Sequence, residues 1–180
     1  MARSAARLGI LTLALLALAA CAAAPTATAP AAPPVATLAP PVSPDQDFLN
    51  RAATGTGSQI ELGRLAQERG LASPVRAFGA RIAAEHSRVH AGLLTLAQQL
   101  NQVPNAATPD LSQLSALSGP DFDRLFMADQ VKNQREALAL FENAAQAGQD
   151  PRLRRFARER VPMLRRDLTQ AESIAARVGA

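Results

Sequence analysis

The chain has 180 residues, which is about the length of one domain once a targeting segment is set aside. Hydrophobic residues make up 48% of the chain, and Ala and Leu supply most of them; with six Phe and no Trp or Tyr, the core is expected to be largely aliphatic. This composition favours helices. The formal charge of +4 includes two arginines of an expected leader, so the imbalance is too small to indicate a nucleic-acid-binding protein.

The first 20 residues have the three parts of a secretory leader in the usual order. Arg3 and Arg7 precede an apolar run over residues 8–18, and the small residues Ala19 and Ala20 follow it. The run is about 11 residues long, well short of the roughly 20 that a helix needs to cross the hydrocarbon core. We therefore expect residues 1–20 to be a signal peptide that is removed, and not a retained transmembrane helix.

Cys21 follows the leader directly and is the only cysteine of the chain. Residues 18–21, Leu-Ala-Ala-Cys, resemble the lipobox of bacterial lipoproteins, in which the cysteine is acylated. A lone cysteine has no disulfide partner in its own chain, and lipidation accounts for it. Because two or three acyl chains anchor a protein stably, we expect a lipoprotein on a membrane of the bacterial cell envelope, facing the periplasm. The alternative is ordinary signal-peptide cleavage with Cys21 incidental.

Residues 21–44 form a segment that cannot build a core. They are almost wholly Ala, Pro, Thr and Val, with prolines at positions 25, 30, 33, 34, 40, 41 and 44. Each proline fixes φ and removes a hydrogen-bond donor, so an extended polyproline II-like tether is expected. The chain thus divides into a lipoprotein signal peptide (1–20), a lipidated cysteine with its tether (21–44) and a folded domain (45–180).

The folded domain is predicted to contain four long helices and one short helical stretch. The expected ranges are 44–69, 73–101, 119–148 and 150 onwards, with the short stretch near 110–117. Ser73-Pro74 and Asp150-Pro151 each place a capping residue before a proline, and Gly70 stops the first helix. Both starts are followed by a Phe and a small residue, Phe78-Gly79 and Phe156-Ala157. An internal repeat of two hairpins and a chance similarity both account for this match.

The first helix is the least regular of the four. Gly55, Gly57 and Gly63 each lower its helix propensity by about 1 kcal/mol relative to Ala. A missing side chain lets a neighbouring helix approach closely, and we expect these glycines to do so.

Polar side chains interrupt the apolar stripes of the last three helices. They are Glu85 and His86 in one helix, Gln134 in the next, and Arg160 and Asp167 in the last. Buried polar groups are costly unless they find partners, so these five are expected to meet in the core. One interpretation is a metal or proton site, as in ferritin-like carboxylate bundles. The other is a metal-free network, which the lack of any Glu-x-x-His motif and the presence of only two histidines favour.

Seven short segments of the domain together form a specific pattern: Asp47-Phe48-Leu49, Ile60-Glu61-Leu62-Gly63, Val75-Arg76-Ala77-Phe78-Gly79, Glu85-His86, Phe122-Asp123-Arg124, Leu140-Phe141-Glu142 and Val161-Pro162. In these segments and their order, the chain resembles the exported bacterial proteins grouped as domain of unknown function 4142, which look ferritin-like. The resemblance implies an all-α, up-and-down four-helix bundle in the periplasm or envelope, with no established activity. In that family histidines commonly stand at the positions of Gln134 and Asp167, whereas Glu61, Glu85 and His86 keep the family's polar pattern.

The stripes and the resemblance together predict a buried polar cluster and no cofactor. Its members are Glu61, Glu85, His86, Gln134, Arg160 and Asp167. The alternative is a divalent metal ion held by Glu61, Glu85, His86 and Asp167. The chain has no glycine-rich phosphate loop, Gly-x-Ser-x-Gly or His-Glu-x-x-His, so no catalytic residue is predicted. We expect a non-enzymatic structural or interaction module; the alternative is a metal-binding or oxidative-stress-related protein.

A dense group of arginines opens the last helix. Its members are Arg152, Arg154, Arg155 and Arg158. They form either a solvated face that nearby acids offset or a contact with an anionic envelope surface, such as lipid headgroups or lipopolysaccharide phosphates. The sequence leaves both interpretations open.

Overall fold

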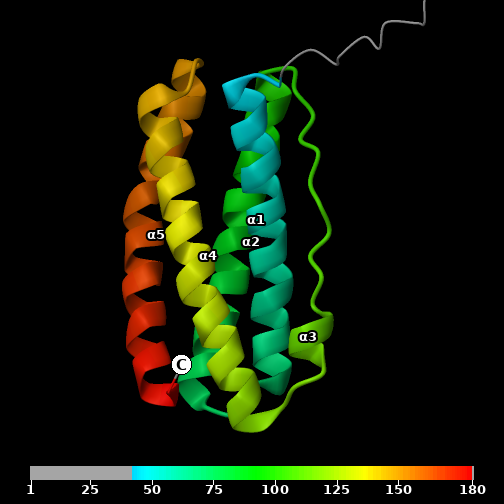
Figure 1. Ribbon diagram of the computed structural model, residues 1–180. Helices are drawn as coiled ribbons and strands as arrows, with labels where there is room; N and C mark the ends of the chain where they lie inside the picture. Colours follow the sequence, from blue (N-terminus) through cyan, green and yellow to red (C-terminus); the bar gives the residue numbers. More distant parts are fainter. Residues whose placement is uncertain (1–41, 180) are drawn as a thin grey trace, which may run out of the picture. The chain divides into compact units, whose positions relative to one another are not determined.

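A computed structural model describes residues 42–179, which form a helical bundle (Figure 1). Its helices are α1 (Pro44–Arg69), α2 (Ser73–Gln99), α3 (Ser112–Ser115), α4 (Gly119–Ala147) and α5 (Pro151–Val178). The long helices run up and down as two hairpins, α1–α2 and α4–α5, and α3 lies on the long connection between them (Figure 1). The predicted all-α, ferritin-like four-helix bundle is confirmed.

The predicted signal peptide, Cys21 and most of the predicted tether lie outside the described residues. The predicted end of the tether, residue 44, coincides with the first residue of α1. None of the helices within residues 42–179 combines the length and apolar character that crossing a membrane requires.

Side-chain caps explain the starts of α1 and α5. Ser43 accepts a hydrogen bond from the backbone N–H of Gln46 at 3.1 Å, and Asp150 accepts one from Arg152 at 2.7 Å. A proline stands in the first turn of each long helix, where a missing N–H costs nothing. Helices α2 and α4 have no side-chain cap: the N-cap of α2 is Ala72 and not Ser73, and Ser118 at the start of α4 makes no capping hydrogen bond. The predicted capping role of Ser73 is therefore wrong.

The turn between α1 and α2 is closed instead by an aspartate of the other hairpin. Asp123, in the first turns of α4, is buried, and its carboxylate accepts hydrogen bonds from the N–H groups of Leu71 and Ala72 at 2.9 and 2.7 Å. Backbone N–H groups at a helix start have no partner within the helix. The Asp123 carboxylate supplies partners for two N–H groups of the turn just before α2.

The turn between α4 and α5 is closed in the same way by Asp45, from the first turn of α1. Its carboxylate accepts hydrogen bonds from the N–H groups of Gln149 and Asp150 at 2.7 and 2.8 Å. Equivalent residues of the two turns stand 78 positions apart (45 and 123, 71 and 149, 72 and 150), and the same separation relates Phe78 to Phe156. The structure thus favours the internal repeat over a chance similarity.

Helices α1 and α2 are in close backbone contact at two glycines. A Cβ on Gly63 would lie 2.5 Å from the carbonyl oxygen of Gly79, and a Cβ on Gly79 would lie 2.8 Å from the carbonyl oxygen of Gly63. The expected close approach is therefore confirmed for Gly63. It is wrong for Gly55 and Gly57, where a Cβ would have no described neighbour within 4 Å.

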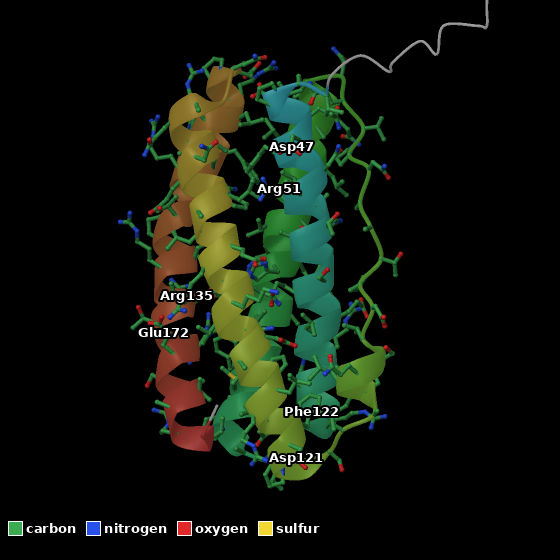
Figure 2. All side chains as sticks on the ribbon, in the orientation of Figure 1. Asp47, Arg51, Asp121, Phe122, Arg135 and Glu172 are labelled. Atoms are coloured by element: carbon green, nitrogen blue, oxygen red, sulfur yellow. The ribbon has the colours of Figure 1, made fainter. Side chains whose placement is uncertain are left out.

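The apolar core consists of two clusters, one toward each end of the bundle. The cluster near the start of α1 includes Phe48 and Phe141, whose rings meet edge to face with centroids 5.1 Å apart. The cluster near the start of α4 includes Phe122, which points inward, whereas Arg135 and Glu172 pair on the outer surface at 2.6 Å (Figure 2). Between the two clusters the core is polar.

Candidate functional site

A layer of buried polar side chains crosses the middle of the bundle, and every long helix contributes to it. Its members, here called the polar layer, are Thr56 and Gln59 of α1, His86 of α2, Gln130 and Gln134 of α4, and Asp167 of α5. Each is at most 5% exposed. The sequence predicted His86, Gln134 and Asp167 in this place. It missed Thr56, Gln59 and Gln130, although all three stand at inward-facing positions of their helices.

Most polar atoms of this layer have no hydrogen-bond partner among residues 42–179. They include both ring nitrogens of His86, both amide atoms of Gln130 and of Gln134, and Oε1 of Gln59. A buried polar group without a partner destabilises a protein by about 1–3 kcal/mol. The polar layer is therefore the part of the bundle where a hydrogen-bonding molecule would gain the most.

Burial sets the protonation state of His86. Desolvation lowers the pKa of its imidazole from 6.5 to about 4; the negative charge of Glu85 opposes this effect, and the positive charge of Arg81 adds to it. At neutral pH the ring is neutral, with one nitrogen as a donor and the other as an acceptor. A ring in this state forms hydrogen bonds and also ligates metals.

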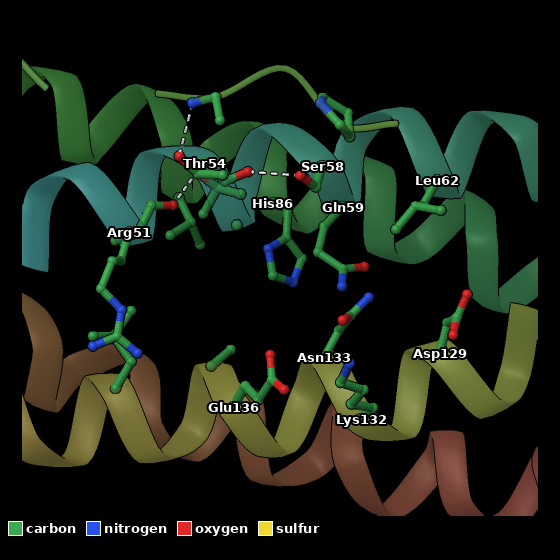
Figure 3. Close-up of a pocket in the computed structure, with 18 of the residues that line it drawn as sticks. Arg51, Thr54, Ser58, Gln59, Leu62, His86, Asp129, Lys132, Asn133 and Glu136 are labelled. Atoms are coloured by element: carbon green, nitrogen blue, oxygen red, sulfur yellow. Dashed lines mark hydrogen bonds between the residues drawn. The ribbon is translucent and has the colours of Figure 1, made fainter. Parts of the chain in front are cut away.

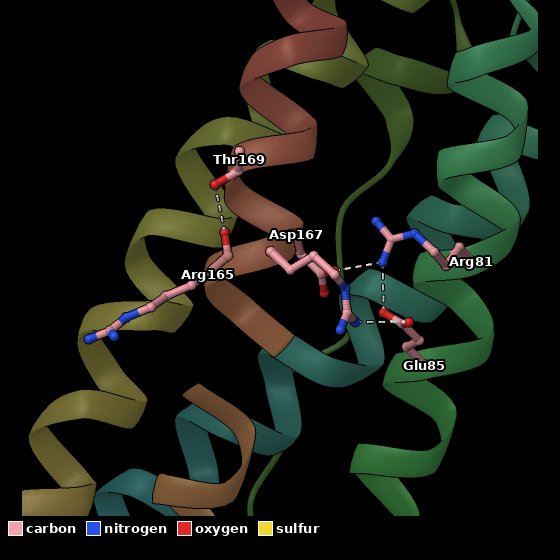
Figure 4. Close-up of polar contacts among 6 residues, drawn as sticks. Arg81, Glu85, Arg165, Asp167 and Thr169 are labelled. Carbon is pink, nitrogen blue, oxygen red and sulfur yellow. Dashed lines mark hydrogen bonds and ion pairs between the residues drawn. The ribbon is translucent and has the colours of Figure 1, made fainter. Parts of the chain in front are cut away.

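A four-residue ionic network joins α2 to α5 at the edge of the polar layer (Figure 4). Arg81 bonds both Asp167, at 2.6 Å, and Glu85, at 2.7 Å, and Arg166 bonds Glu85 at 3.1 Å. Asp167 is fully buried, and this desolvation raises the pKa of its carboxyl against the opposing hydrogen bond from Arg81. The sequence prediction overlooked Arg81, although its position four residues before Glu85 on one helix favours an ion pair.

Three predicted members lie outside the polar layer. Glu85 is partly exposed and belongs to the ionic network at the edge of the layer, and Glu61 and Arg160 lie elsewhere. Glu61 is on the solvent face of α1 and pairs with Arg64 at 2.8 Å. The guanidinium carbon of Arg160 lies 3.9 Å from the ring centroid of Phe156, and its Nη1 bonds Glu159 at 2.7 Å. The assignments of Glu61 and Arg160 were wrong. Successive residues of a helix point about 100° apart, so a small error in the rotation of α1 moves Glu61 from the core to the surface. The long side chain of Arg160 extends back along its own helix instead of into the core.

The alternative metal site is not assembled from its four predicted residues. Glu61 lies on the outer surface, and the carboxylates of Glu85 and Asp167 are both bound by Arg81. Across residues 42–179, no group of three or more His, Cys, Asp or Glu side chains is close enough to hold a metal ion. The predicted donor set is therefore corrected: of the four, His86 alone is without a competing partner.

A cleft of about 670 Å³ opens beside the polar layer, between α1 and α4. Figure 3 shows His86 and Gln59 pointing into the cleft, with Asn133 and Glu136 of α4 facing them. The connection that follows α2 lines another side, through Pro109 among others. Of the unpartnered side chains of the polar layer, Gln59 and His86 line the cleft, whereas Gln130 and Gln134 do not.

Three hydrogen bonds hold this connection against α1, one of them from Nε2 of Gln46 to the carbonyl oxygen of Val103 at 3.1 Å. The N–H of Asn105 donates to Oδ1 of Asn50 at 2.8 Å, and the N–H of Ala107 donates to Oγ1 of Thr54 at 2.9 Å. The bond to Thr54 is visible in Figure 3. The wall that the connection gives to the cleft is thus fixed by backbone hydrogen bonds.

The arginines at the start of α5 are largely engaged within the chain. Arg152 and Arg155 form ion pairs with nearby acids at 2.8 and 2.9 Å, and Arg154 donates to a carbonyl oxygen at the end of α4 at 2.7 Å. Arg158 is the one member of the group without such a partner in the described part of the chain. This arrangement favours the interpretation as a solvated face that nearby acids offset.

The sequence matches the family model described as "Domain of unknown function (DUF4142)" over residues 26–174. The chain belongs to the DUF4142 family. The match includes α1–α4 and most of α5, so the resemblance found in the sequence is confirmed. No curated protein matches the chain.

Several solved structures share the fold of this DUF4142 protein at low sequence identity. A DUF305 fragment from Deinococcus radiodurans is 18% identical, with a TM-score of 0.67 over 77% of this chain and 99% of the fragment. A putative secreted DUF305 protein from Streptomyces coelicolor is 14% identical, with a TM-score of 0.66 over 77% of this chain and 95% of its own. CopM in the Cu(I)-bound form is 18% identical, with a TM-score of 0.63 over 72% of this chain and 93% of CopM. These likenesses show the helical-bundle fold.

Proposed function

We propose that this DUF4142 protein is a non-enzymatic lipoprotein of the bacterial cell envelope whose bundle serves as a binding module. The observation that carries the binding role is the polar layer, where unpartnered groups of Gln59 and His86 meet the cleft. Amide and neutral imidazole groups bind through hydrogen bonds. The buried acid of the layer, Asp167, is held by Arg81 and is not presented to the cleft as a base. The leader and Cys21 support the envelope location.

The envelope location is tested by the substitution Cys21→Ser. Without an acylated cysteine the protein has no lipid anchor, so it leaves the membrane fraction or accumulates as an uncleaved precursor. Cell fractionation with palmitate labelling measures both outcomes, and Ala22→Ser, which keeps the cysteine, remains attached and labelled. A processed Cys21→Ser protein that stays with the membrane contradicts the lipoprotein proposal.

A second candidate function is the binding of a soft monovalent metal ion. His86 and Met163 both line the cleft, and neither ring nitrogen of His86 has a partner among the described residues. Imidazole and thioether groups suit Cu(I). The fold is shared with CopM, which is described in Cu(I)-bound and Ag-bound forms.

Thermal unfolding with added metal separates this candidate from the first. We expect zinc, iron and manganese ions to leave Tm unchanged, because no described group of three His, Cys, Asp or Glu residues offers them a site. A ligand that binds only the native state raises Tm by mass action. A saturable rise with Ag(I) that His86→Leu and Met163→Leu both remove establishes the metal function, and an unchanged Tm excludes it.

A further inference from the structure

We propose that the cleft between α1 and α4 binds a small neutral molecule that carries hydroxyl or amide groups, with His86 and Gln59 as its innermost contacts. This inference rests on the proposed role as a binding module and names the class of its ligand. Gln59 is 5% exposed and His86 is 2% exposed, and both line the cleft (Figure 3). Both ring nitrogens of His86 and Oε1 of Gln59 have no hydrogen-bond partner within residues 42–179.

The internal repeat shows that the fold does not require polar side chains at these two positions. Adding 78 to each number leads to the equivalent positions of the second hairpin, which hold Leu164 for His86 and Ala137 for Gln59. Leu164 is buried in an apolar cluster, and Ala137 packs against the same cluster. At these two equivalent positions, the second hairpin has an apolar residue and the first hairpin has a polar side chain without a hydrogen-bond partner. A hydrogen-bonding molecule in the cleft would supply partners for these two side chains.

The size and lining of the cleft match a small molecule. Its volume of about 670 Å³ lies inside the range of roughly 300–1,000 Å³ that is usual for small-molecule sites. The carboxamides of Gln59 and Asn133 face one another across it (Figure 3). A carboxamide both donates and accepts hydrogen bonds, as hydroxyl and amide groups of a ligand do.

The charges around the cleft favour a neutral ligand. Behind the layer, the carboxylates of Glu85 and Asp167 are paired with Arg81, and Arg166 also bonds Glu85. These four groups cancel one another, so the network offers no uncompensated charge to an ion. The charged residues that line the cleft itself are Arg51 and Lys132 against Asp110, Asp129 and Glu136, so both signs are present in nearly equal number and neither a cation nor an anion is favoured.

Binding to the full-length lipoprotein in detergent tests the proposal. The neutral probes are N-acetylglucosamine and N-acetylalaninamide; the charged probes are glucosamine, a cation, and glucuronate, an anion. Isothermal titration calorimetry is expected to show saturable binding of at least one neutral probe, at least tenfold tighter than either charged probe. His86→Leu and Gln59→Ala, which copy the second hairpin, are expected to weaken it at least tenfold. The exposed control Gln98→Ala leaves it unchanged.

Other outcomes overturn the proposal. The proposal is wrong if neither neutral probe binds saturably, if neutral and charged probes bind with equal affinity, or if neither variant changes the affinity. Should His86→Leu fail to fold by circular dichroism, Gln59→Ala, whose side chain lies at the cleft wall, decides alone. If neither neutral probe binds but Ag(I) binds saturably, the protein is still a binding module, and its ligand is a soft metal ion. Failure with every probe and with Ag(I) removes the binding role itself, and the Cys21→Ser fractionation judges the lipoprotein role independently.

Discussion

A single absent Cβ at Gly63 sets the distance between α1 and α2. Gly63→Ala would place its Cβ 2.5 Å from the carbonyl oxygen of Gly79, a backbone atom that cannot rotate away. We expect this substitution to lower the free energy of unfolding by about 1–3 kcal/mol, the usual cost of overpacking. Urea unfolding followed by circular dichroism measures it.

Gly55 provides the matched control on the same helix. A Cβ there would meet no described atom within 4 Å, so Gly55→Ala is expected to raise the free energy of unfolding by up to about 1 kcal/mol through helix propensity. Equal effects of Gly55→Ala and Gly63→Ala would show that close helix contact is not what the second glycine provides.

At the scale of elements, the two hairpins are joined end to end by reciprocal aspartates. Asp123→Ala removes both acceptors from the N–H groups of Leu71 and Ala72. Two partly buried donors then lack partners, so we expect the free energy of unfolding to fall by about 2–4 kcal/mol. Amide hydrogen exchange at residues 71 and 72 is expected to accelerate as well.

The control for this prediction is Asp121→Ala, in the same helical turn. Asp121 is exposed and pairs with Arg124 three residues on, and exposed ion pairs contribute less than about 1 kcal/mol. Asp45→Ala, at the opposite end of the bundle, is expected to lower the free energy of unfolding as Asp123→Ala does. The two decreases are expected to be additive, because the two sites share no partner. Unaltered exchange at residues 71 and 72 in Asp123→Ala would contradict the cross-hairpin role.

At the scale of the whole molecule, the polar layer makes stability depend on pH through His86. The pKa of His86 is about 4 in the fold and 6.5 in the unfolded chain, so the unfolded state binds more protons between these values. The free energy of unfolding therefore falls as pH drops from 6.5 to 4, by roughly 1.4 kcal/mol per pH unit and about 3 kcal/mol in all. Denaturant unfolding at a series of pH values measures the slope.

His86→Leu isolates this effect, because it removes the titrating group and nothing else that is charged. The variant is expected to lose the downward slope between pH 6.5 and 4. Asp167 acts in the opposite sense: burial raises the pKa of its carboxyl in the fold, so protonation at low pH stabilises the native state. A variant with the wild-type slope would show that His86 does not supply the pH dependence.

Local signals in the sequence determined much of this protein. The 3.6-residue apolar periodicity, the prolines in first helical turns, and caps such as Ser43 and Asp150 act within a few residues of the chain, so helix number and approximate bounds follow from it. The leader, Cys21 and the segments of the family resemblance are also recognised from short stretches of consecutive residues. Likewise, His86 and Asp167 were found because they interrupt an apolar stripe.

Only the tertiary structure decided which polar groups meet. The rotation of each helix placed Glu61 in solvent and Gln59, two residues earlier, in the core, since neighbouring positions point about 100° apart. The pairing of the two hairpins brought Asp123 to a turn more than 50 residues away, and it placed Arg81 beside Asp167. Such contacts depend on how complete helices pack against one another, and no short stretch of sequence specifies that packing.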